Sequence, residues 1–376
     1  MADDVGVLLV SGEYPPAVGG LADYTACLRG ALEARGLDVR IMTRRRRGPA
    51  LPGVFAGVGR WDARALPWLV RLAPRDGIVH VQYQAAAFDL LGDICLAPTV
   101  LRLARPDTRV VTTFHDARVP YLFPRAGPLR RLAIDLLART SAAVLASDER
   151  DLRALGGPSP RHHLVPIGSN VDCEPPPGYD RHVFRGSLGL APDQLAIAYF
   201  GLLNASKGLD VLLATFQLVL DREPRARLLL VGGEVGASDP TDRLTAARFQ
   251  SRVEPFGDRV LRPGYLAPER LSSYLLAADV ALMPYADGAS ARRGTLLACA
   301  THGLPIVTTG PNLAEYVLVA PVGDAPALAE AVLQVATEPT LRERLQRASR
   351  HLAKQSSWPG IAERHLAIYH ALAHGG

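Results

Sequence analysis

The feature that most constrains the fold of this chain is the alternation of short apolar runs with helical patterns along its whole length. Such alternation is typical of βαβ units, in which helices cover the faces of a parallel sheet. The predicted strands are residues 5–10, 39–43, 78–83, 110–114, 143–146, 163–167, 195–200, 227–231, 260–262, 280–284 and 305–308. The predicted helices are residues 21–35, 91–105, 129–140, 209–220, 268–278, 295–301, 327–337, 341–354 and 361–373. The pattern predicts an α/β protein built on doubly wound sheets.

The chain is too long for one ordinary hydrophobic core, and its 376 residues predict two domains. Residues 173–178 contain consecutive prolines, which fix φ and lack N–H donors, so regular structure cannot continue there. We therefore expect a first Rossmann-like domain over residues 1–178 and a second over residues 179–356. Doubly wound sheets bind ligands beyond the carboxyl ends of their strands, so two facing domains predict a site in the cleft between them.

The composition is that of a soluble globular protein, with 48% hydrophobic and 21% charged residues. No apolar run reaches the ~18 residues needed to span a bilayer, and the first residues show no signal pattern. These features predict a cytoplasmic protein. The four cysteines stand far apart and the ten histidines show no metal-binding spacing, so we expect neither a disulfide framework nor a bound metal.

A basic run, Arg44, Arg45, Arg46 and Arg47, directly follows a predicted strand. Such a run can bind anionic lipid headgroups at about 1 kcal/mol per residue, which makes peripheral contact with the inner membrane face one hypothesis. It can equally bind a phosphorylated acceptor or remain a solvated loop, and the solvated loop is the favoured interpretation. No aromatic residues alternate with these arginines, so nucleic acid is not an expected partner.

Residues 195–208 join an apolar strand, a turn at Gly201 and a lysine, Lys207, at the start of a helix. The N–H groups and the dipole at a helix N-terminus favour an anion, and a lysine adds a mobile positive charge. The 42 basic residues include only two lysines, Lys207 and Lys354. A lysine at this turn of an arginine-rich chain indicates that a compact charge is needed, which predicts a phosphate site. The alternative is a solvated lysine near a helix start.

Several segments of the chain resemble the GT-B glycosyltransferases, most closely the retaining enzymes of the family-4 type. These segments are residues 11–20, 35–40, 78–83, 112–116, 231–234, 262–266, 300–305 and 357–376. The resemblance covers nearly the whole chain. It implies the GT-B fold of two facing Rossmann-like domains, with a C-terminal helix, residues 357–376, that crosses back onto the N-terminal domain.

In the first domain the resemblance implies that Gly19 and Gly20 let the backbone approach the diphosphate of the donor, as unhindered glycine N–H groups at a helix start can do. It places His115, at the end of a strand, beside the transferred sugar as a positioning group. The alternative is a histidine that caps the strand end against Asp116. The candidate acceptor-binding residues are Glu13, Asp23 and Asp116.

In the second domain the resemblance implies that Gly233 lies in the turn after the second strand and that residues 262–266 meet the nucleotide base. Tyr265 stacks on the base in this interpretation, and filling the turn is an equally good one. The chain departs from the family ahead of the turn at residues 300–305, where Ser290 and Ala298 occupy the positions of two glutamates. The second glutamate normally binds the ribose hydroxyls, which alanine cannot do.

A second departure is Leu202, which replaces an arginine that contacts the diphosphate in the family. Arg292 and Arg293 stand directly before Gly294 and Thr295 at a predicted helix start. Since a guanidinium matches phosphate oxygens bidentately, we expect Arg292 or Arg293 to take over the role lost at Leu202. Alternatively, both arginines line a solvated helix face. The ribose would be held by Asp287 or by backbone groups.

These residues predict a retaining, hexosyltransferase-like enzyme that moves a sugar from a nucleoside-diphosphate sugar to an acceptor hydroxyl in the cleft. His115, Lys207 and Arg292 are the residues predicted to act in catalysis, and neither a cofactor nor a metal is expected. The expected partners are the nucleotide sugar and a small-molecule, glycan or lipid-linked acceptor. Two alternatives are a non-catalytic protein that binds a sugar nucleotide or a partner, and an epimerase-like enzyme of the same fold.

Overall fold

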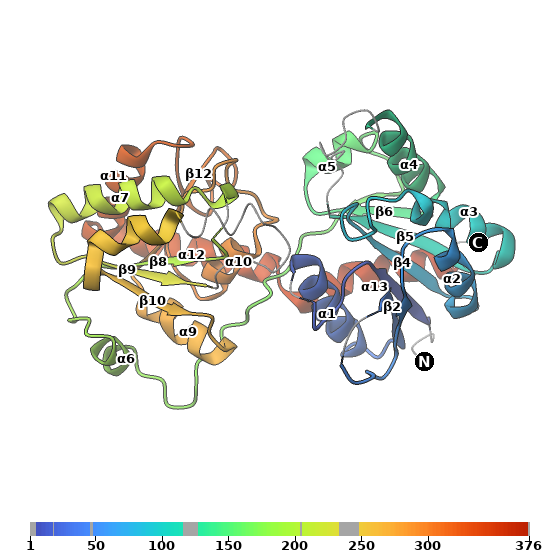
Figure 1. Ribbon diagram of the computed structural model, residues 1–376, viewed down its shortest axis with the longest axis horizontal. Coiled ribbons are helices and arrows are strands. Elements are labelled where there is room, and N and C mark those ends of the chain that lie inside the picture. Colours follow the sequence, from blue (N-terminus) through green and yellow to red (C-terminus); the bar gives the residue numbers. More distant parts are fainter. Residues whose placement is uncertain are drawn as a thin grey trace. The chain divides into compact units, whose positions relative to one another are not determined.

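Two parallel sheets organise the residues that the computed structural model describes, which are 5–17, 19–45, 48–115, 127–203, 205–232 and 248–374 (Figure 1). Over these residues one sheet has seven strands in the order β3-β2-β1-β4-β5-β6-β7, and the other has six in the order β10-β9-β8-β11-β12-β13. The chain divides accordingly into unit 1, Met1–Ile167 with Trp358–Gly376, and unit 2, Gly168–Ser357. The α/β class and the doubly wound sheets predicted from the sequence are confirmed.

The sheet of unit 1 carries helices on both of its faces. Its strands are β1 (Val7–Ser11), β2 (Val39–Arg44), β3 (Val54–Val58), β4 (Ile78–Tyr83), β5 (Arg109–Phe114), β6 (Ala143–Ala146) and β7 (His162–Leu164). Its helices are α1 (Gly20–Glu33), α2 (Leu66–Leu72), α3 (Ala97–Ala104), α4 (Gly127–Thr140), α5 (Glu149–Ala154) and α13 (Trp358–His374), with 3₁₀ turns at Ala63–Ala65 and Asp93–Leu96.

Side chains that alternate along each strand of unit 1 pack into two separate cores. On one face Leu8 and Val10 pack with Leu101 of α3. On the other face Val7 and Leu9 lie in a core to which α1 and α13 contribute. Because both faces are covered, the central strands are largely apolar, which is the pattern that made them recognisable in the sequence.

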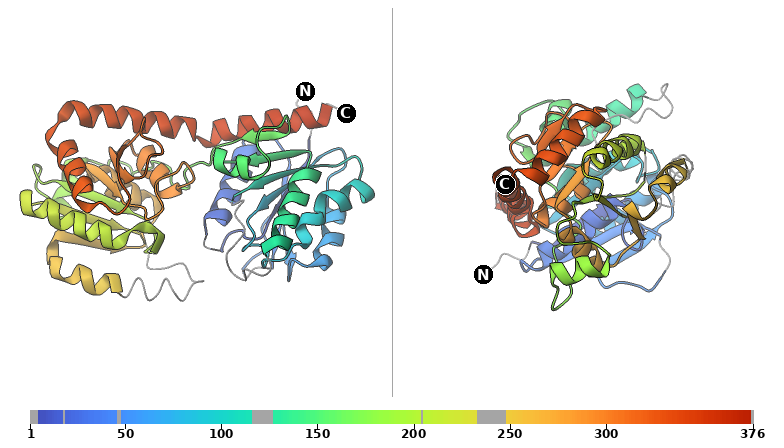
Figure 2. Two further views of the ribbon diagram at one scale, coloured as in Figure 1. Left: turned by 90° about the horizontal axis from the view of Figure 1, so that it is seen from above. Right: turned by 90° about the vertical axis from the view of Figure 1, so that its left-hand side faces the viewer.

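Helix α13 completes unit 1 from the far end of the sequence and lies along its sheet (Figure 2). The hydroxyl of Tyr369 lies 2.6 Å from Nδ1 of His80 in β4, and both side chains are fully buried. At the start of α13, Arg35 pairs with Glu363 at 2.9 Å and donates to the carbonyl of Pro359 at 3.1 Å. Helix α13 therefore belongs to unit 1, both by its packing and by its polar contacts.

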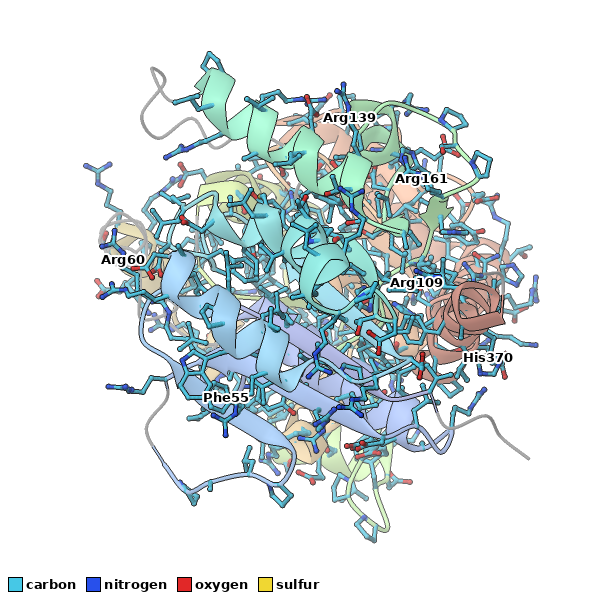
Figure 3. All side chains as sticks on the ribbon, turned by 90° about the vertical axis from the view of Figure 1, so that its right-hand side faces the viewer. Phe55, Arg60, Arg109, Arg139, Arg161 and His370 are labelled. Carbon is cyan, nitrogen blue, oxygen red and sulfur yellow. The ribbon has the colours of Figure 1, made fainter. Side chains whose placement is uncertain are left out.

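The carbonyl groups at the end of α4 are satisfied by an arginine that directly precedes β7. Nη1 of Arg161 donates to the carbonyls of Arg139 and Ser141, at 3.0 and 2.8 Å. Arg139 and Arg161 are labelled together on the α4 side of unit 1 in Figure 3. A cation at this position also complements the negative end of the helix dipole.

Unit 2 repeats the same plan. Its strands are β8 (Ala196–Phe200), β9 (Arg227–Val231), β10 (Val260–Gly264), β11 (Val280–Met283), β12 (Ile306–Thr309) and β13 (Leu318–Ala320). Its helices are α6 (Arg181–Ser187), α7 (Leu209–Arg222), α9 (Pro268–Ala277), α10 (Gly294–Thr301), α11 (Ala325–Thr337) and α12 (Pro339–Gln355), with 3₁₀ turns at Ala205–Lys207 and Glu254–Arg259. Helices α7 and α11 pack side by side on one face (Figure 1).

The strand order of each sheet reverses at one point. In unit 1 the first strand, β1, lies between β2 and β4, and in unit 2 the first strand, β8, lies between β9 and β11. Doubly wound sheets place their ligands at such points, beyond the carboxyl ends of the strands. The loops after β1 and β4, and those after β8 and β11, are therefore where each unit would bind a ligand.

Some elements differ from those predicted. Strands β3 and β13 and helices α2, α5 and α6 were not predicted, and the helix predicted over residues 91–105 is a 3₁₀ turn followed by α3. The units divide at Ile167 and Gly168, before the proline segment that the sequence suggested. The proline segment stays with unit 2 because the N–H of Glu174 donates to Oγ of Ser272 at 3.1 Å and the hydroxyl of Tyr179 to the carbonyl of Ser273 at 3.1 Å.

Candidate functional site

Two glycine turns meet at the carboxyl ends of β8 and β9 in unit 2. Gly201 and Gly232 have φ values of 151° and 136°, which side chains disfavour. A Cβ atom on Gly232 would lie 2.2 Å from the carbonyl oxygen of Gly201. The close approach of the two backbones requires glycine at 232 and leaves the edge of the sheet open.

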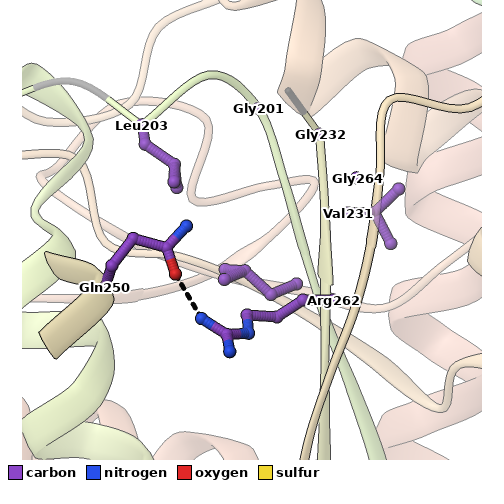
Figure 4. Close-up of a pocket in the computed structure, with 8 residues that line it drawn as sticks. Gly201, Leu203, Val231, Gly232, Gln250, Arg262 and Gly264 are labelled. Carbon is purple, nitrogen blue, oxygen red and sulfur yellow. Dashed lines mark hydrogen bonds between the residues drawn. The ribbon is translucent and has the colours of Figure 1, made fainter. Parts of the chain in front are cut away.

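A cavity of about 350 Å³ opens beside these turns (Figure 4). It is lined by Gly201, Leu203, Leu230, Val231, Gly232, Gln250, Arg262 and Gly264. Within it Nη1 of Arg262 donates to Oε1 of Gln250. The cavity combines apolar walls with a guanidinium and an amide, the mixture that small-molecule sites use for burial and for specificity.

Lys207 lies at the same edge, at the end of the 3₁₀ turn that leads into α7. Its Nζ donates to Oγ1 of Thr295 at 3.3 Å and lies 5.0 Å from the ring centroid of Tyr285. Burial, together with the charge of Arg293, lowers the pKa of Lys207 to about 8, whereas Asp287 acts in the opposite direction. Because burial removes water from this ammonium, an anion beside it would replace the lost solvation and would bind favourably.

Arg293 is the member of the arginine pair that the structure places over the ring of Tyr285, with Cζ 4.5 Å from the centroid. Its guanidinium also pairs with the carboxylate of Asp287. Two cations therefore share this ring, and one of them also pairs with a carboxylate. Arg293 thus lies beside Lys207, and the replacement of the arginine missing at Leu202 by Arg292 or Arg293 stays a prediction.

Helix α10 begins directly after Arg293, with Gly294 and Thr295 in its first turn. The N–H of Arg293 donates to the carbonyl of Ser290 at 3.1 Å, which closes the turn that leads into the helix. Ala298 is fully buried within α10. Tyr265 is 87% exposed. The structure thus gathers Ser290, Arg293, Gly294 and Thr295 near Lys207, while Tyr265 stands out in solvent.

In unit 1 the loop after β1 and the start of α1 face one another. Gly19 is the N-cap of α1 and Gly20 its first residue. A Cβ on Gly19 would lie 3.0 Å from Oε2 of Glu13, and a Cβ on Gly20 would meet nothing within 4 Å among the described residues. Desolvation raises the pKa of the carboxyl groups of Glu13 and Asp23.

His115 directly follows β5 and contacts β4 and α1. Its Nε2 lies 2.9 Å from Oε1 of Gln82, its N–H donates to the carbonyl of Tyr83 at 3.0 Å, and its ring meets the ring of Tyr24 edge-on at 4.6 Å. Parallel pairing of β1, β4 and β5 brings Ser11, Gln82 and Thr113 into register, so His115 and the loop with Glu13 share one edge. Asp116 and Gly233 lie outside the described residues.

The predicted basic run is only partly described. The guanidinium of Arg44 pairs with Asp89, whose carboxylate also accepts from the N–H of Trp61 at 3.0 Å. Arg46 and Arg47 lie outside the described residues. Arg44 is therefore engaged within unit 1.

Sequence reasoning did not single out Gln82, Gln250 and Tyr285 as site residues. Gln82 and Tyr285 stand at or directly after the carboxyl ends of predicted strands, so the rule that α/β sheets bind ligands there could have identified them. Arg262 was expected only as part of the segment 262–266, and its contact with Gln250 was not predictable because it depends on the packing of β10 against the helical segment at residues 248–253.

Residues 194–338 match the model of the family described as "Glycosyl transferases group 1". A D-inositol 3-phosphate glycosyltransferase from Jonesia denitrificans is 28% identical over 413 residues, which cover 93% of this chain and 91% of that protein. A phosphatidyl-myo-inositol mannosyltransferase from Mycobacterium leprae is 24% identical over 394 residues, covering 95% and 94%. Residues 194–338 therefore match the group 1 glycosyltransferases, and over nearly its whole length the chain is similar to proteins named as glycosyltransferases.

The fold of the chain is that of known glycosyltransferase structures. The crystal structure of Anabaena HepE in complex with UDP is similar at a TM-score of 0.74 and 15% identity, covering 98% of this chain and 100% of that one. The predicted GT-B fold and transferase class are confirmed. The family match contains Lys207, Tyr285 and Arg293, so the cluster at the edge of unit 2 lies in the shared region. Among the described residues no helix has both the length and the apolar character needed to cross a membrane.

Proposed function

We propose that this glycosyltransferase takes its sugar from a nucleoside-diphosphate donor and transfers it to an acceptor hydroxyl with retained anomeric configuration. The observation that carries the proposal is the cluster of Lys207 and Arg293 beside Gly201, where Nζ of Lys207 and the guanidinium share the ring of Tyr285. A diphosphate needs concentrated positive charge next to an unhindered backbone, and this edge supplies both.

The cavity lined by Arg262 and Gln250 adjoins the same glycine turns, so we assign it to the nucleoside. Its walls contain Gly201 and Gly232, which would put base and diphosphate on either side of one turn. The similarity to HepE, which was crystallised in complex with UDP, supports a nucleotide as the ligand.

The transfer breaks the bond between the anomeric carbon and the diphosphate oxygen and forms a bond from that carbon to the acceptor oxygen. The acceptor proton passes to the departing diphosphate oxygen, so that no enzyme nucleophile is required for a front-face substitution. Lys207 and Arg293 stabilise the charge that develops on the diphosphate, which is usually the largest contribution to such catalysis. His115 positions the sugar, and a metal has no part in this scheme.

The acceptor is assigned to unit 1, where Glu13 and Asp23 flank the loop after β1. Both relatives described above carry an inositol in their names, so inositol and inositol phosphates are the first acceptors to test. Carboxylates can bind the hydroxyl groups of such polyols as acceptors of hydrogen bonds.

The first experiment is ligand-dependent melting with UDP, GDP, TDP and their sugars, in the presence and absence of EDTA. A ligand that binds the folded state alone stabilises it by about 2.7 kcal/mol at one hundred times Kd. We expect a shift with one nucleotide class that is lost in Lys207→Ala and in Arg293→Ala. Absence of any shift in the unaltered protein would overturn the proposal. If one nucleotide class does shift the melting temperature, hydrolysis of its sugar donor in the absence of acceptor distinguishes an enzyme from a protein that only binds.

A further inference from the structure

Tyr285 is a buried residue in the loop after β11, and its backbone is fixed by hydrogen bonds. Its side chain is 1% exposed. Its N–H donates to the carbonyl of Met283 at 3.0 Å, and its carbonyl accepts from Oγ1 of Thr309 at 2.6 Å. The residue is therefore fixed to both β11 and β12, and its ring cannot adjust much to what binds above it.

Two cations and one hydroxyl meet this ring. Nζ of Lys207 lies 5.0 Å and Cζ of Arg293 4.5 Å from its centroid. The hydroxyl of Tyr285 lies 2.9 Å from Oγ1 of Thr295, the atom to which Lys207 donates. Ring, hydroxyl and ammonium thus form one connected set that spans β11, α10 and the start of α7.

This arrangement brings two positive charges close together. Lys207 and Arg293 repel one another, and the carboxylate of Asp287 acts on Lys207 in the opposite direction. An aromatic face attracts cations without neutralising them. The ring can therefore hold the two side chains close together without neutralising either, and the one carboxylate of the cluster is Asp287, which pairs with Arg293.

We propose that Tyr285 is a positioning residue of the donor site, which holds Lys207 and Arg293 at one aromatic ring and so sets the affinity for the diphosphate rather than for the nucleoside. The inference rests on the proposed function. Leu202 stands where the resembling family has an arginine that contacts the diphosphate. In this proposal the ring of Tyr285 holds a cation from another loop at the phosphate in its place.

The test compares Tyr285→Phe with Tyr285→Leu by calorimetric titration of the nucleoside diphosphate that stabilises the unaltered protein and of its free nucleoside. Phe keeps the aromatic face, so the Kd for the diphosphate should stay within about threefold. Leu removes it, so that Kd should rise at least about tenfold while the Kd for the nucleoside changes less than about twofold. Equal behaviour of the two variants would overturn the inference, and failure of the unaltered protein to bind would overturn the donor site itself.

A second measurement covers the case in which Tyr285→Leu does not fold. Phenylalanines with increasing numbers of ring fluorines are incorporated at position 285, because fluorine weakens the attraction of the ring face for cations at nearly constant shape. We expect the affinity for the diphosphate to fall stepwise along the series, with nucleoside affinity and melting temperature unchanged. A flat series would show that Tyr285 only fills space.

Discussion

A Cβ atom on Gly208 would lie 1.8 Å from the carbonyl oxygen of Pro284. Gly208 directly follows Lys207, and Pro284 directly precedes Tyr285, so this contact sets how closely the cation can approach the ring. The N–H of Ala286 donates to the carbonyl of Ser206 at 3.0 Å and reinforces the same junction. The turn before α7 and the loop after β11 thus meet backbone to backbone, in addition to the contact of Lys207 with the ring of Tyr285.

Gly208→Ala should destabilise the protein by about 3 kcal/mol or more, because the new methyl group meets a backbone oxygen and the residue has a left-handed φ of 64°. Gly189→Ala is the matched control, since Gly189 has a φ of 70° but a Cβ there meets nothing within 4 Å among the described residues. That variant should lose only about 1 kcal/mol, the cost of the backbone strain. Urea unfolding of both variants checks the difference, and equal losses would contradict it.

Binding of the nucleoside diphosphate should weaken as the pH rises above about 8, the pKa to which burial and Arg293 lower Lys207. Below that pH the ammonium is charged and attracts the anion, and above it the amine is neutral. In Lys207→Arg the decline should disappear, because a guanidinium stays charged. Calorimetric titrations between about pH 6 and about pH 9.5 measure this, and a decline that persists in Lys207→Arg would assign it to another group.

The lowered pKa of Lys207 has a consequence for stability. Between about 8 and the ordinary value of 10.5 the unfolded chain binds more protons at Lys207 than the folded chain, so the contribution of this residue to stability rises with pH across that window. At neutral pH the buried ammonium is unfavourable, and Lys207→Met should raise the melting temperature while it abolishes diphosphate binding. A lower melting temperature would show that the contacts with Thr295 and Tyr285 outweigh desolvation.

Asp287→Asn should tighten diphosphate binding about threefold, because the carboxylate competes with phosphate for the guanidinium of Arg293. Asp193→Asn is the control: it also removes one negative charge from an exposed ion pair, with Arg225 at 2.7 Å, but on another part of unit 2. Titrations at low and high salt compare the two variants. Weaker binding in Asp287→Asn would favour the alternative role of Asp287 in holding the ribose.

His115→Ala should lower kcat at least about tenfold and leave the Kd for the nucleoside diphosphate unchanged, since the imidazole is assigned to the sugar. Gln82→Leu removes the oxygen that lies 2.9 Å from Nε2 of His115, so it should reproduce part of the loss by releasing the ring. Initial rates of transfer or of donor hydrolysis measure both. A loss of diphosphate affinity in either variant would contradict the assignment.

His365→Phe should stabilise the protein against acid. Burial lowers the pKa of His365 to about 4, so the unfolded chain binds more protons below the ordinary value of 6.5 and stability falls as the pH decreases through that window. The full shift corresponds to roughly 3 kcal/mol. Urea unfolding at about pH 7 and about pH 4.5 should show a smaller difference for His365→Phe than for the unaltered protein. His370→Gln, on the exposed side of the same helix, should leave the difference unchanged.

The fold could be predicted because most strands of both sheets are buried on two faces and read as continuous apolar runs. Strands β3 and β13 were missed because they are short edge strands whose residues are only partly buried. Lys207 and Gly201 were predictable because strand, turn and helix follow one another in sequence. The contacts of Arg293 and Lys207 with the ring of Tyr285 were not predictable, because they depend on which way side chains point where three separate segments meet.

The contribution of α13 to unit 1 also affects the order in which the protein can fold during synthesis. Ile361, Ala362, Ile368 and Tyr369 belong to the same core as Val7 and Leu9, yet they leave the ribosome after all of unit 2. Unit 2 is a continuous stretch of chain and can complete its core first. One apolar face of unit 1 therefore stays uncovered until the whole of unit 2 has been synthesised. A pause or a premature stop in translation before residue 358 would leave that face exposed to chaperones and to aggregation.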